Sequence, residues 1–386
     1  MNIGIDLRAL AGGSVSGVTV YLHSLLLELF RLDDRNRYFL WFNSAKEKVP
    51  ALDLPHSPRF KLIHTRHSNR KLNLELSLRG KPFLDRLILD TEERKNEKLD
   101  LFWLPDPRPV ALSPDCKLVA TIHDLSPELY QQFFSLKTRF WHKLLRMKHI
   151  AERADLLITP SQATAGDLER LWNIAADKIA VTPLGVADDL QRTNPGKIRQ
   201  KYNLPEKFVL SLSTLEPRKN LGILIKAFTD LKQEIDLPHE LVLAGKRDSK
   251  IFANPETGNW KLATGGRIHF PGFIAESDKA ALLSAADAFC FPSIYEGFGL
   301  PALEAMKVGT PLLAADIPAI REVCGDAAKL IPPRNVDAWR VALQKVLTDS
   351  ELREEMSRAG IRRAQKFGWK RTAKETLKAF EKVGKP

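Results

Sequence analysis

Two carboxylates stand in a segment whose glycines and proline suit the binding of a phosphorylated ligand. Glu296 lies in a glycine-rich turn, and Glu304 follows on the helix that the sequence predicts directly after it. Pro301 suits the first helical position, and Gly309 suits the left-handed residue that ends a helix. The N-terminal end of a helix favours anions such as a diphosphate. We therefore expect this segment to bind a diphosphate, with the two carboxylates holding sugar hydroxyls.

Two cations occupy a comparable position earlier in the chain. Arg218 and Lys219 follow a strand predicted over residues 208–213 and precede a helix predicted over 221–231. Pro217 fixes the turn between them, so both side chains can reach a diphosphate at the strand's end. The alternative is that they are ordinary surface charges.

His123 and Gly17 are the candidates in the first half of the chain. His123 closes a buried strand over 118–124, at the end where parallel sheets place their binding residues. A histidine there is often only a hydrogen-bonded structural residue, so the residues alone leave both roles open. Gly17 ends a glycine-containing loop, 8–17, that leads into a helix expected from Val18. This loop does not match Gly-x-Gly-x-x-Gly, which argues against a dinucleotide site and a dehydrogenase.

Strands and helices alternate along both halves of the chain, which indicates an α/β protein. The length of 386 residues favours two domains. We expect the first over residues 1–187 and the second over 188–369, with a polar linker over 187–201. An amphipathic final helix within 370–386 is expected to return to the first domain.

The net charge indicates the kind of partner, and the cysteines indicate the cellular compartment. The net charge of +12 implies an anionic partner, for which a phosphorylated substrate, a membrane surface and nucleic acid are the candidates. Cys116, Cys290 and Cys324 are widely spaced and form neither a disulfide nor a zinc pattern, which favours a reducing cytoplasm. The N-terminus lacks the pattern of a signal peptide, and no apolar run reaches the roughly 18 residues of a membrane span.

One segment, residues 131–153, combines basic and apolar residues at helical spacing. It holds six Lys or Arg against the single acid Glu152. A basic amphipathic helix can bind anionic lipid. A helix that packs its apolar stripe on the core would show the same pattern, and the sequence leaves both interpretations open.

The motifs together resemble glycosyltransferase family 4. The residues that carry this resemblance are Glu-Pro-Arg-Lys-Asn at 216–220 and Glu296 and Glu304 in their Gly-Phe-Gly-Leu-Pro setting. The start Ile-Gly-Ile-Asp-x-Arg, the strand end at His123, the Pro-Leu-Gly-Val at 183–186 and the final helix also fit. The resemblance covers nearly the whole chain. It implies the GT-B fold, two Rossmann-like α/β/α domains with a cleft between them, and a retaining sugar transfer.

The resemblance also implies a role for each candidate residue. Glu296 would bind hydroxyls of the donor sugar, and Glu304 the ribose hydroxyls of the nucleotide. Arg218 and Lys219 would neutralise the diphosphate leaving group, and His123 would contact the sugar near the reaction centre. The remaining residues expected to line the donor site are Gly17, Ile274, Gly297, Phe298, Gly299 and Leu300.

Two departures from the family and one absent motif bear on the mechanism. Many members carry an arginine where this chain has Ser213-Thr214, and a second loop glycine where it has Thr19. The charge of the diphosphate therefore rests more heavily on Arg218 and Lys219. Retention is usually explained by attack on the same face as the leaving group, which needs no enzymatic nucleophile, so Glu296 is expected to position the sugar. The chain has no Asp-x-Asp, and we expect no metal cofactor.

The leading functional hypothesis is transfer of mannose from GDP-mannose. The acceptor would be a glycan or lipid-linked molecule in surface polysaccharide or glycolipid assembly. The alternative within the family is a UDP- or ADP-sugar donor, of the glucosyl type. A remote alternative is a non-enzymatic nucleic-acid binder, for which no motif is present, so we expect no nucleic-acid partner. The expected location is the cytoplasm, with peripheral attachment to the inner face of the cell membrane through 131–153 left open.

Overall fold

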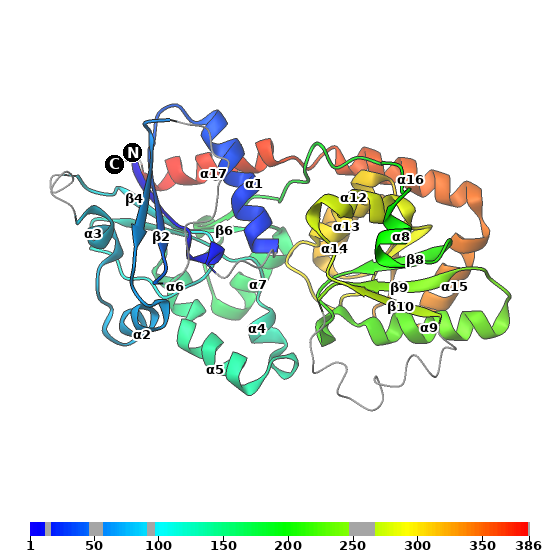
Figure 1. Ribbon diagram of the computed structural model, residues 1–386. Helices are drawn as coiled ribbons and strands as arrows, with labels where there is room; N and C mark the ends of the chain where they lie inside the picture. The colour runs from blue at the N-terminus through cyan, green and yellow to red at the C-terminus, as the bar shows by residue number, and fades with distance from the viewer. Residues whose placement is uncertain (12–16, 46–56, 91–96, 247–266, 385–386) are drawn as a thin grey trace. The chain divides into compact units, whose positions relative to one another are not determined.

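The chain folds into two compact units in the computed structural model, which describes residues 1–11, 17–45, 57–90, 97–246 and 267–384. Unit 1 comprises Met1–Gly185 with Trp369–Pro386, and unit 2 comprises Val186–Gly368 (Figure 1). The boundaries expected from the sequence, after residues 187 and 369, lie within two residues of these.

Unit 1 is built on a seven-stranded parallel sheet with the order β3-β2-β1-β4-β5-β6-β7. The chain moves outward from β1 to one edge, then crosses back to β4 and continues to the other edge. Ligands of such sheets bind where this direction reverses, at the carboxyl ends of the strands. The strands are β1 (Asn2–Asp6), β2 (Arg37–Asn43), β3 (Phe60–Thr65), β4 (Leu101–Leu104), β5 (Lys117–Thr121), β6 (Leu156–Thr159) and β7 (Ile179–Val181).

Helices cover this sheet, and the last helix of the chain is one of them. The helices of unit 1 are α1 (Gly17–Leu32), α2 (Asn69–Arg79), α3 (Leu84–Leu89), α4 (Ser126–Leu129), α5 (Leu136–Leu145), α6 (Met147–Arg153), α7 (Gln162–Trp172) and α17 (Trp369–Gly384). Figure 1 shows α17 beside α1, against which it packs. The Thr372 hydroxyl donates to the Pro183 carbonyl over 2.7 Å. The return of the final helix to the first unit is therefore confirmed.

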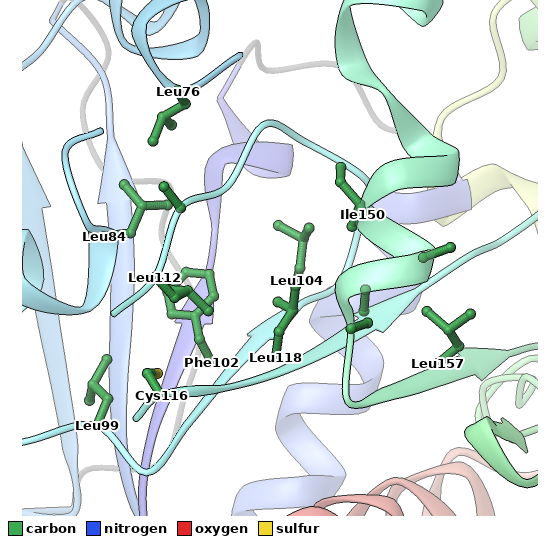
Figure 2. Packing of buried hydrophobic residues seen from close by; sticks show 14 of the residues in the cluster. Leu76, Leu84, Leu99, Phe102, Leu104, Leu112, Cys116, Leu118, Ile150 and Leu157 are labelled. Atoms are coloured by element: carbon green, nitrogen blue, oxygen red, sulfur yellow. The ribbon is translucent and has the colours of Figure 1, made fainter. Parts of the chain in front are cut away.

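The core of unit 1 is apolar and close-packed. Figure 2 shows Phe102 of β4, Leu118 of β5 and Leu157 of β6 meeting side chains from the helices and loops over one sheet face. Near-continuous apolar strands are typical of parallel sheets that are buried on both faces. Burial raises the pKa of the Cys116 thiol in this cluster. Cys116, Cys290 and Cys324 are all free and buried.

A buried arginine ties the start of the chain to two distant segments. Arg8 Nη2 lies 2.6 Å from Asp6 Oδ2, and both residues are buried. Its guanidinium also donates to Asn73 Oδ1 at 2.8 Å and to the Pro109 carbonyl at 3.0 Å. The ring of Trp41 lies 4.9 Å from the guanidinium carbon. The opening Asp-x-Arg, which contributed to the family resemblance, is therefore a structural anchor within unit 1.

The basic segment 131–153 is not one helix. Arg146 adopts a left-handed conformation, φ 50°, and separates α5 from α6. Because Arg146 is not a glycine, such a φ is uncommon. The expectation of a single helix here was wrong. Among the helices of the described residues, none is long and apolar enough to cross a bilayer.

Unit 2 repeats the architecture with a six-stranded parallel sheet of order β10-β9-β8-β11-β12-β13. Its strands are β8 (Phe208–Leu212), β9 (Glu240–Ala244), β10 (Ile268–Gly272), β11 (Ala288–Phe291), β12 (Leu312–Ala315) and β13 (Lys329–Ile331). Its helices are α8 (Ile198–Tyr202), α9 (Leu221–Glu234), α12 (Glu276–Ala285), α13 (Leu300–Val308), α14 (Pro318–Cys324), α15 (Val336–Thr348) and α16 (Ser350–Ala364). The chain reverses direction between β8 and β11, so the loops that follow these two strands meet at one edge of the sheet.

Candidate active site

The loops after β8 and β11 bring two cations and one carboxylate into direct contact. Lys219 Nζ lies 2.5 Å from Glu296 Oε1, and Arg218 Nη1 lies 3.2 Å from Glu296 Oε2. The three side chains are only 14%, 11% and 10% exposed for Arg218, Lys219 and Glu296. The interpretation of Arg218 and Lys219 as plain surface charges is therefore wrong. We call these three residues the charge cluster.

A second carboxylate holds the arginine from its other side. Glu216 Oε1 accepts from Arg218 Nη2 at 2.8 Å and from Nε at 3.1 Å. The Tyr295 carbonyl accepts from Arg218 Nη1 at 3.0 Å. Planar guanidinium groups held from several sides lose little freedom when they bind a further anion. Glu216 belongs to the 216–220 motif, but the sequence assigned it no role.

Asn220 secures the loop after β8 through its side-chain amide. It is the residue before α9 and has a left-handed backbone, φ 53°, but its side chain does not cap the helix. Its amide donates instead to the carbonyls of Pro292 and Pro333, at 3.2 and 2.7 Å. This amide joins the loop after β8 to the end of β11, and so helps to hold the charge cluster in place.

Glu296 is ionised at neutral pH. Burial by itself would raise the pKa of Glu296, but the neighbouring charges of Lys219 and Arg218 outweigh it and lower the pKa to about 2. Because the folded pKa lies below the ordinary value, its contribution to stability is present above about pH 4.5 and is lost as the pH falls toward 2. At neutral pH the side chain can accept hydrogen bonds from hydroxyl groups, and it cannot serve as a proton donor.

The backbone geometry of the turn before α13 requires a glycine at position 299. Gly299 has φ 99°, and a Cβ at this position would lie 2.4 Å from Ile320 Cδ1. The sequence hypothesis explained this glycine by the approach of a ligand, whereas the structure supplies a reason within the protein. Pro301 is the second residue of α13, and Gly309 ends the helix in the expected left-handed conformation. Glu296 of the charge cluster thus lies in the segment directly before the positive end of a helix.

We expect Gly299→Ala to lower the free energy of unfolding by about 1–3 kcal/mol, because the new methyl group is strained by its φ and collides with Ile320. Urea denaturation measures this change. Gly222→Ala is the matched control, since a Cβ there meets nothing within 4 Å. Equal stability of the two variants would contradict the steric argument.

Glu304 has partners of its own. Lys279 Nζ of α12 lies 2.6 Å from Glu304 Oε1 on α13 and 2.7 Å from Glu276 Oε1. Glu304 is buried, which raises its pKa, and the charge of Lys279 opposes this rise. Glu296 and Glu304 therefore lie in distinct surroundings, as two carboxylates with different tasks would. Lys279 was not found from the sequence, because no motif connects it with a residue 25 positions away.

The other residues of unit 2 that were expected to line the donor site differ in how far they are buried. Ile274 is buried after Gly272, whose φ is 82°. Phe298 is buried, and its ring makes an edge contact with Phe367 at 5.9 Å between centroids. Only the backbone of Phe298 is therefore suited to contact a ligand. Gly297 is also buried, while Leu300 is partly exposed.

Gly17 and His123 belong to unit 1. Gly17 begins α1 and is exposed, and a Cβ there would meet nothing within 4 Å. The structure thus gives no steric reason for this glycine, and the other glycines of its loop lie outside the described residues. His123 Nε2 lies 2.8 Å from the Pro105 carbonyl, and the Tyr21 ring makes an edge contact with the imidazole at 4.8 Å.

The contact with Pro105 determines the tautomer of His123. A carbonyl oxygen only accepts, so Nε2 carries the hydrogen, and a neutral ring presents Nδ1 as an acceptor. A sugar hydroxyl could donate to that nitrogen, and the role of His123 as a sugar contact stays a prediction. The following Asp124 accepts from the backbone N–H and the hydroxyl of Ser126, at 2.8 and 2.6 Å, and so stabilises the turn after β5.

No group of three or more His, Cys, Asp or Glu side chains in the described part of the chain is placed to hold a metal ion. The cations that adjoin Glu296 come from the protein itself. The expectation that the reaction needs no metal ion stays a prediction from the sequence.

Comparisons with known proteins agree with the motifs. A family model described as Glycosyltransferase Family 4 matches residues 15–190, and one described as Glycosyl transferases group 1 matches residues 196–363. O-antigen chain mannosyltransferase B of Escherichia coli is 32% identical over 276 residues, which cover 69% of this chain and 70% of that protein. The serotype-specific mannosyltransferase WbdA of Escherichia coli is 30% identical over 276 residues, 69% of this chain but only 34% of WbdA.

Solved structures show the same fold. Sucrose-phosphate synthase from Thermosynechococcus elongatus superposes with a TM-score of 0.72 at 21% identity, covering 99% of both chains. Anabaena HepE in complex with UDP and glucose gives 0.70 at 19% identity, covering 99% of this chain and 100% of HepE. The two parallel-sheet α/β units thus form a GT-B fold. The chain belongs to glycosyltransferase family 4, and it is a mannosyltransferase-like hexosyltransferase.

Proposed function

We propose that this enzyme is a retaining mannosyltransferase that uses GDP-mannose and extends a glycan or lipid-linked acceptor in surface polysaccharide or glycolipid assembly. The charge cluster carries the proposal, because it combines cations for a diphosphate with an ionised carboxylate for sugar hydroxyls. The names of the relatives, O-antigen chain mannosyltransferase B and mannosyltransferase WbdA, support mannose as the sugar and a polysaccharide as the product.

The proposed chemistry follows the charge that develops in the reaction. As the bond between the anomeric carbon and the phosphate oxygen breaks, negative charge grows on the diphosphate, and Arg218, Lys219 and the start of α13 stabilise it. A guanidinium offers five N–H donors and an ammonium three, so each can serve Glu296 and a phosphate oxygen together. The acceptor oxygen bonds to the same face of the sugar, and its proton passes to the leaving phosphate.

In this scheme Glu296 positions the sugar. Its pKa of about 2 makes it a poor general acid, and its oxygens are already held by Lys219 and Arg218. A fixed carboxylate that accepts from sugar hydroxyls orients the anomeric carbon toward the acceptor.

A donor screen tests the proposal. GDP-mannose, UDP-glucose and ADP-glucose are each incubated with the enzyme and candidate acceptors, with and without a metal chelator, and released diphosphate and product are measured. Turnover of GDP-mannose to an α-linked product, unaffected by chelation, is expected. Turnover of UDP-glucose alone, or inversion at the anomeric carbon, would overturn it.

Transfer of glucose from UDP-glucose is the second candidate. It is favoured by the similarity in fold to HepE, whose structure contains UDP and glucose. At 19% identity that similarity shows the fold alone, which is why we rank it below mannose. The same screen separates the two.

Glu304 is proposed to bind the ribose, and we expect Glu304→Gln to weaken GDP binding about tenfold, since a charge-assisted hydrogen bond is replaced by a neutral one. Calorimetry with GDP and 2′,3′-dideoxy-GDP checks the contact. The dideoxy analogue should bind the unaltered enzyme weakly and the variant no worse than GDP does. Glu276→Gln serves as the control, because it removes the other carboxylate that contacts Lys279. The Glu276 side chain is 54% exposed. Equal losses in both variants would refute the ribose contact.

A further inference from the structure

Exposed apolar side chains gather on two helices of unit 1. Nine large apolar residues are exposed among the described residues, and five of them lie on α2 and α5. These five are Leu74, Leu78, Leu136, Phe140 and Trp141. Scattered single apolar residues on a surface need no explanation, but a group of them does.

Helix α5 exposes three of its large apolar side chains, while Leu144 and Leu145 near its end are partly buried. None of its residues is buried, and Leu136 and Phe140, one turn apart on one face, are 81% and 66% exposed. Trp141 adds a side chain that is 37% exposed. The alternative that 131–153 packs its apolar stripe on the core therefore does not hold for Leu136 and Phe140, while Ile150 on α6 does pack there.

Cations accompany this face. Exposed basic residues on or next to α5 are Lys137, Arg139, Lys143 and Arg146. None of these four forms an ion pair with a carboxylate that the structure describes. The only acid within 131–153 is Glu152, which lies on α6.

Helix α2 also combines exposed apolar and basic residues, although it carries one exposed acid, Glu75. Leu72 and Leu76 are buried against the core, whereas Leu74 and Leu78, also one turn apart, are 47% and 71% exposed. Exposed basic residues on this helix are Arg70, Lys71 and Arg79. Figure 1 shows α2 and α5 along the same margin of unit 1, drawn at its lower side.

We propose that α2 and α5 together form a docking surface for a bilayer that contains anionic phospholipid. Apolar side chains flanked by Lys and Arg enter the boundary between headgroups and acyl chains, and the cations bind the anionic headgroups. A second copy of the chain is a poor occupant, because two cationic faces repel each other. The surface holds the enzyme at a membrane, where a lipid-linked acceptor resides.

The electrostatic part is tested with vesicles of phosphatidylcholine alone and with phosphatidylglycerol added. Sedimentation should show binding only to the anionic vesicles, weakened by high salt. Replacing Lys137, Arg139, Lys143 and Arg146 with Ser should lower binding by about tenfold or more, since each cation near the surface contributes. Four exposed cations of unit 2, Lys345, Arg358, Arg362 and Lys366, changed to Ser, are the control with the same loss of charge. Equal weakening in the control would overturn the proposal.

The apolar part is tested by two double variants. Leu136→Ser with Phe140→Ser, and Leu74→Ser with Leu78→Ser, should each weaken vesicle binding several-fold. Val341→Ser with Ile361→Ser removes exposed apolar residues from unit 2 and should leave binding unchanged. All six side chains are exposed, so circular dichroism should show that the variants remain folded.

Three further results would overturn the proposal. The first is a lack of binding to anionic vesicles by the unaltered protein. The second is self-association, seen by sedimentation velocity, that the Leu136→Ser, Phe140→Ser variant abolishes, which would make a second copy the occupant. The third is duplex DNA that binds in place of vesicles and depends on the same four cations, which would make nucleic acid the partner.

Discussion

Glu296→Ala is expected to lower kcat about a thousandfold while GDP binds as well as before or more tightly. The loss follows because the donor sugar is no longer held toward the acceptor, and effects of this size accompany the loss of one transition-state contact. Binding of the diphosphate is spared because Arg218 and Lys219 remain. Without the carboxylate these buried cations are under-compensated, and an anion then replaces the missing charge.

Steady-state kinetics and calorimetry with GDP measure the two effects separately. Glu216→Ala is the control, because it also removes a carboxylate from Arg218, and we expect a smaller loss of kcat. With a pKa of about 2, Glu296 should add no ionisation to the pH–rate profile between about pH 5 and 8. Normal turnover by Glu296→Ala would refute the positioning role while leaving the family assignment intact.

Arg8→Ala is expected to lower the free energy of unfolding of unit 1 by about 3–5 kcal/mol. The substitution leaves Asp6 buried without its cation, and an uncompensated buried charge carries a cost of this size. It also removes the bonds to Asn73 and Pro109 and the contact with Trp41. Urea denaturation followed by tryptophan fluorescence measures the change.

Two further variants show whether the buried charge is the cause. Arg170→Ala breaks an exposed pair with Asp167 on α7 and should cost no more than about 1 kcal/mol. Asp6→Asn combined with Arg8→Met removes both charges, so it should be less destabilising than Arg8→Ala alone. A cost below about 1 kcal/mol for Arg8→Ala would show that the pair does not support unit 1.

The sequence predicted well those features that depend on residues close to one another in the chain. The helix after the glycine turn and its end at Gly309 follow from neighbouring residues, and the structure confirms them. The meeting of Arg218 and Glu296 was predictable because parallel strands present their carboxyl ends at one edge.

The remainder depends on contacts between distant segments. Lys279 reaches Glu304 only because α12 packs beside α13. The spacing of these two residues in the sequence does not predict that they pair. Arg8 looked like part of a family motif, and its partners Asn73 and Pro109 lie far along the chain. The sequence did not predict the break between α5 and α6 at Arg146, because the φ of Arg146 is unusual for a residue other than glycine.

The return of α17 to unit 1 has a consequence for the order in which the protein is made. Its residues Thr372, Ala373 and Phe380 are buried, and the Phe380 ring lies 5.5 Å from Trp103 of β4. The ribosome releases these residues only after all of unit 2 has been synthesised. Unit 2 can therefore close its core first, while unit 1 stays incomplete until α17 has been synthesised. A stop codon that removes α17 would accordingly damage unit 1, although all the strands of that unit precede unit 2 in the sequence.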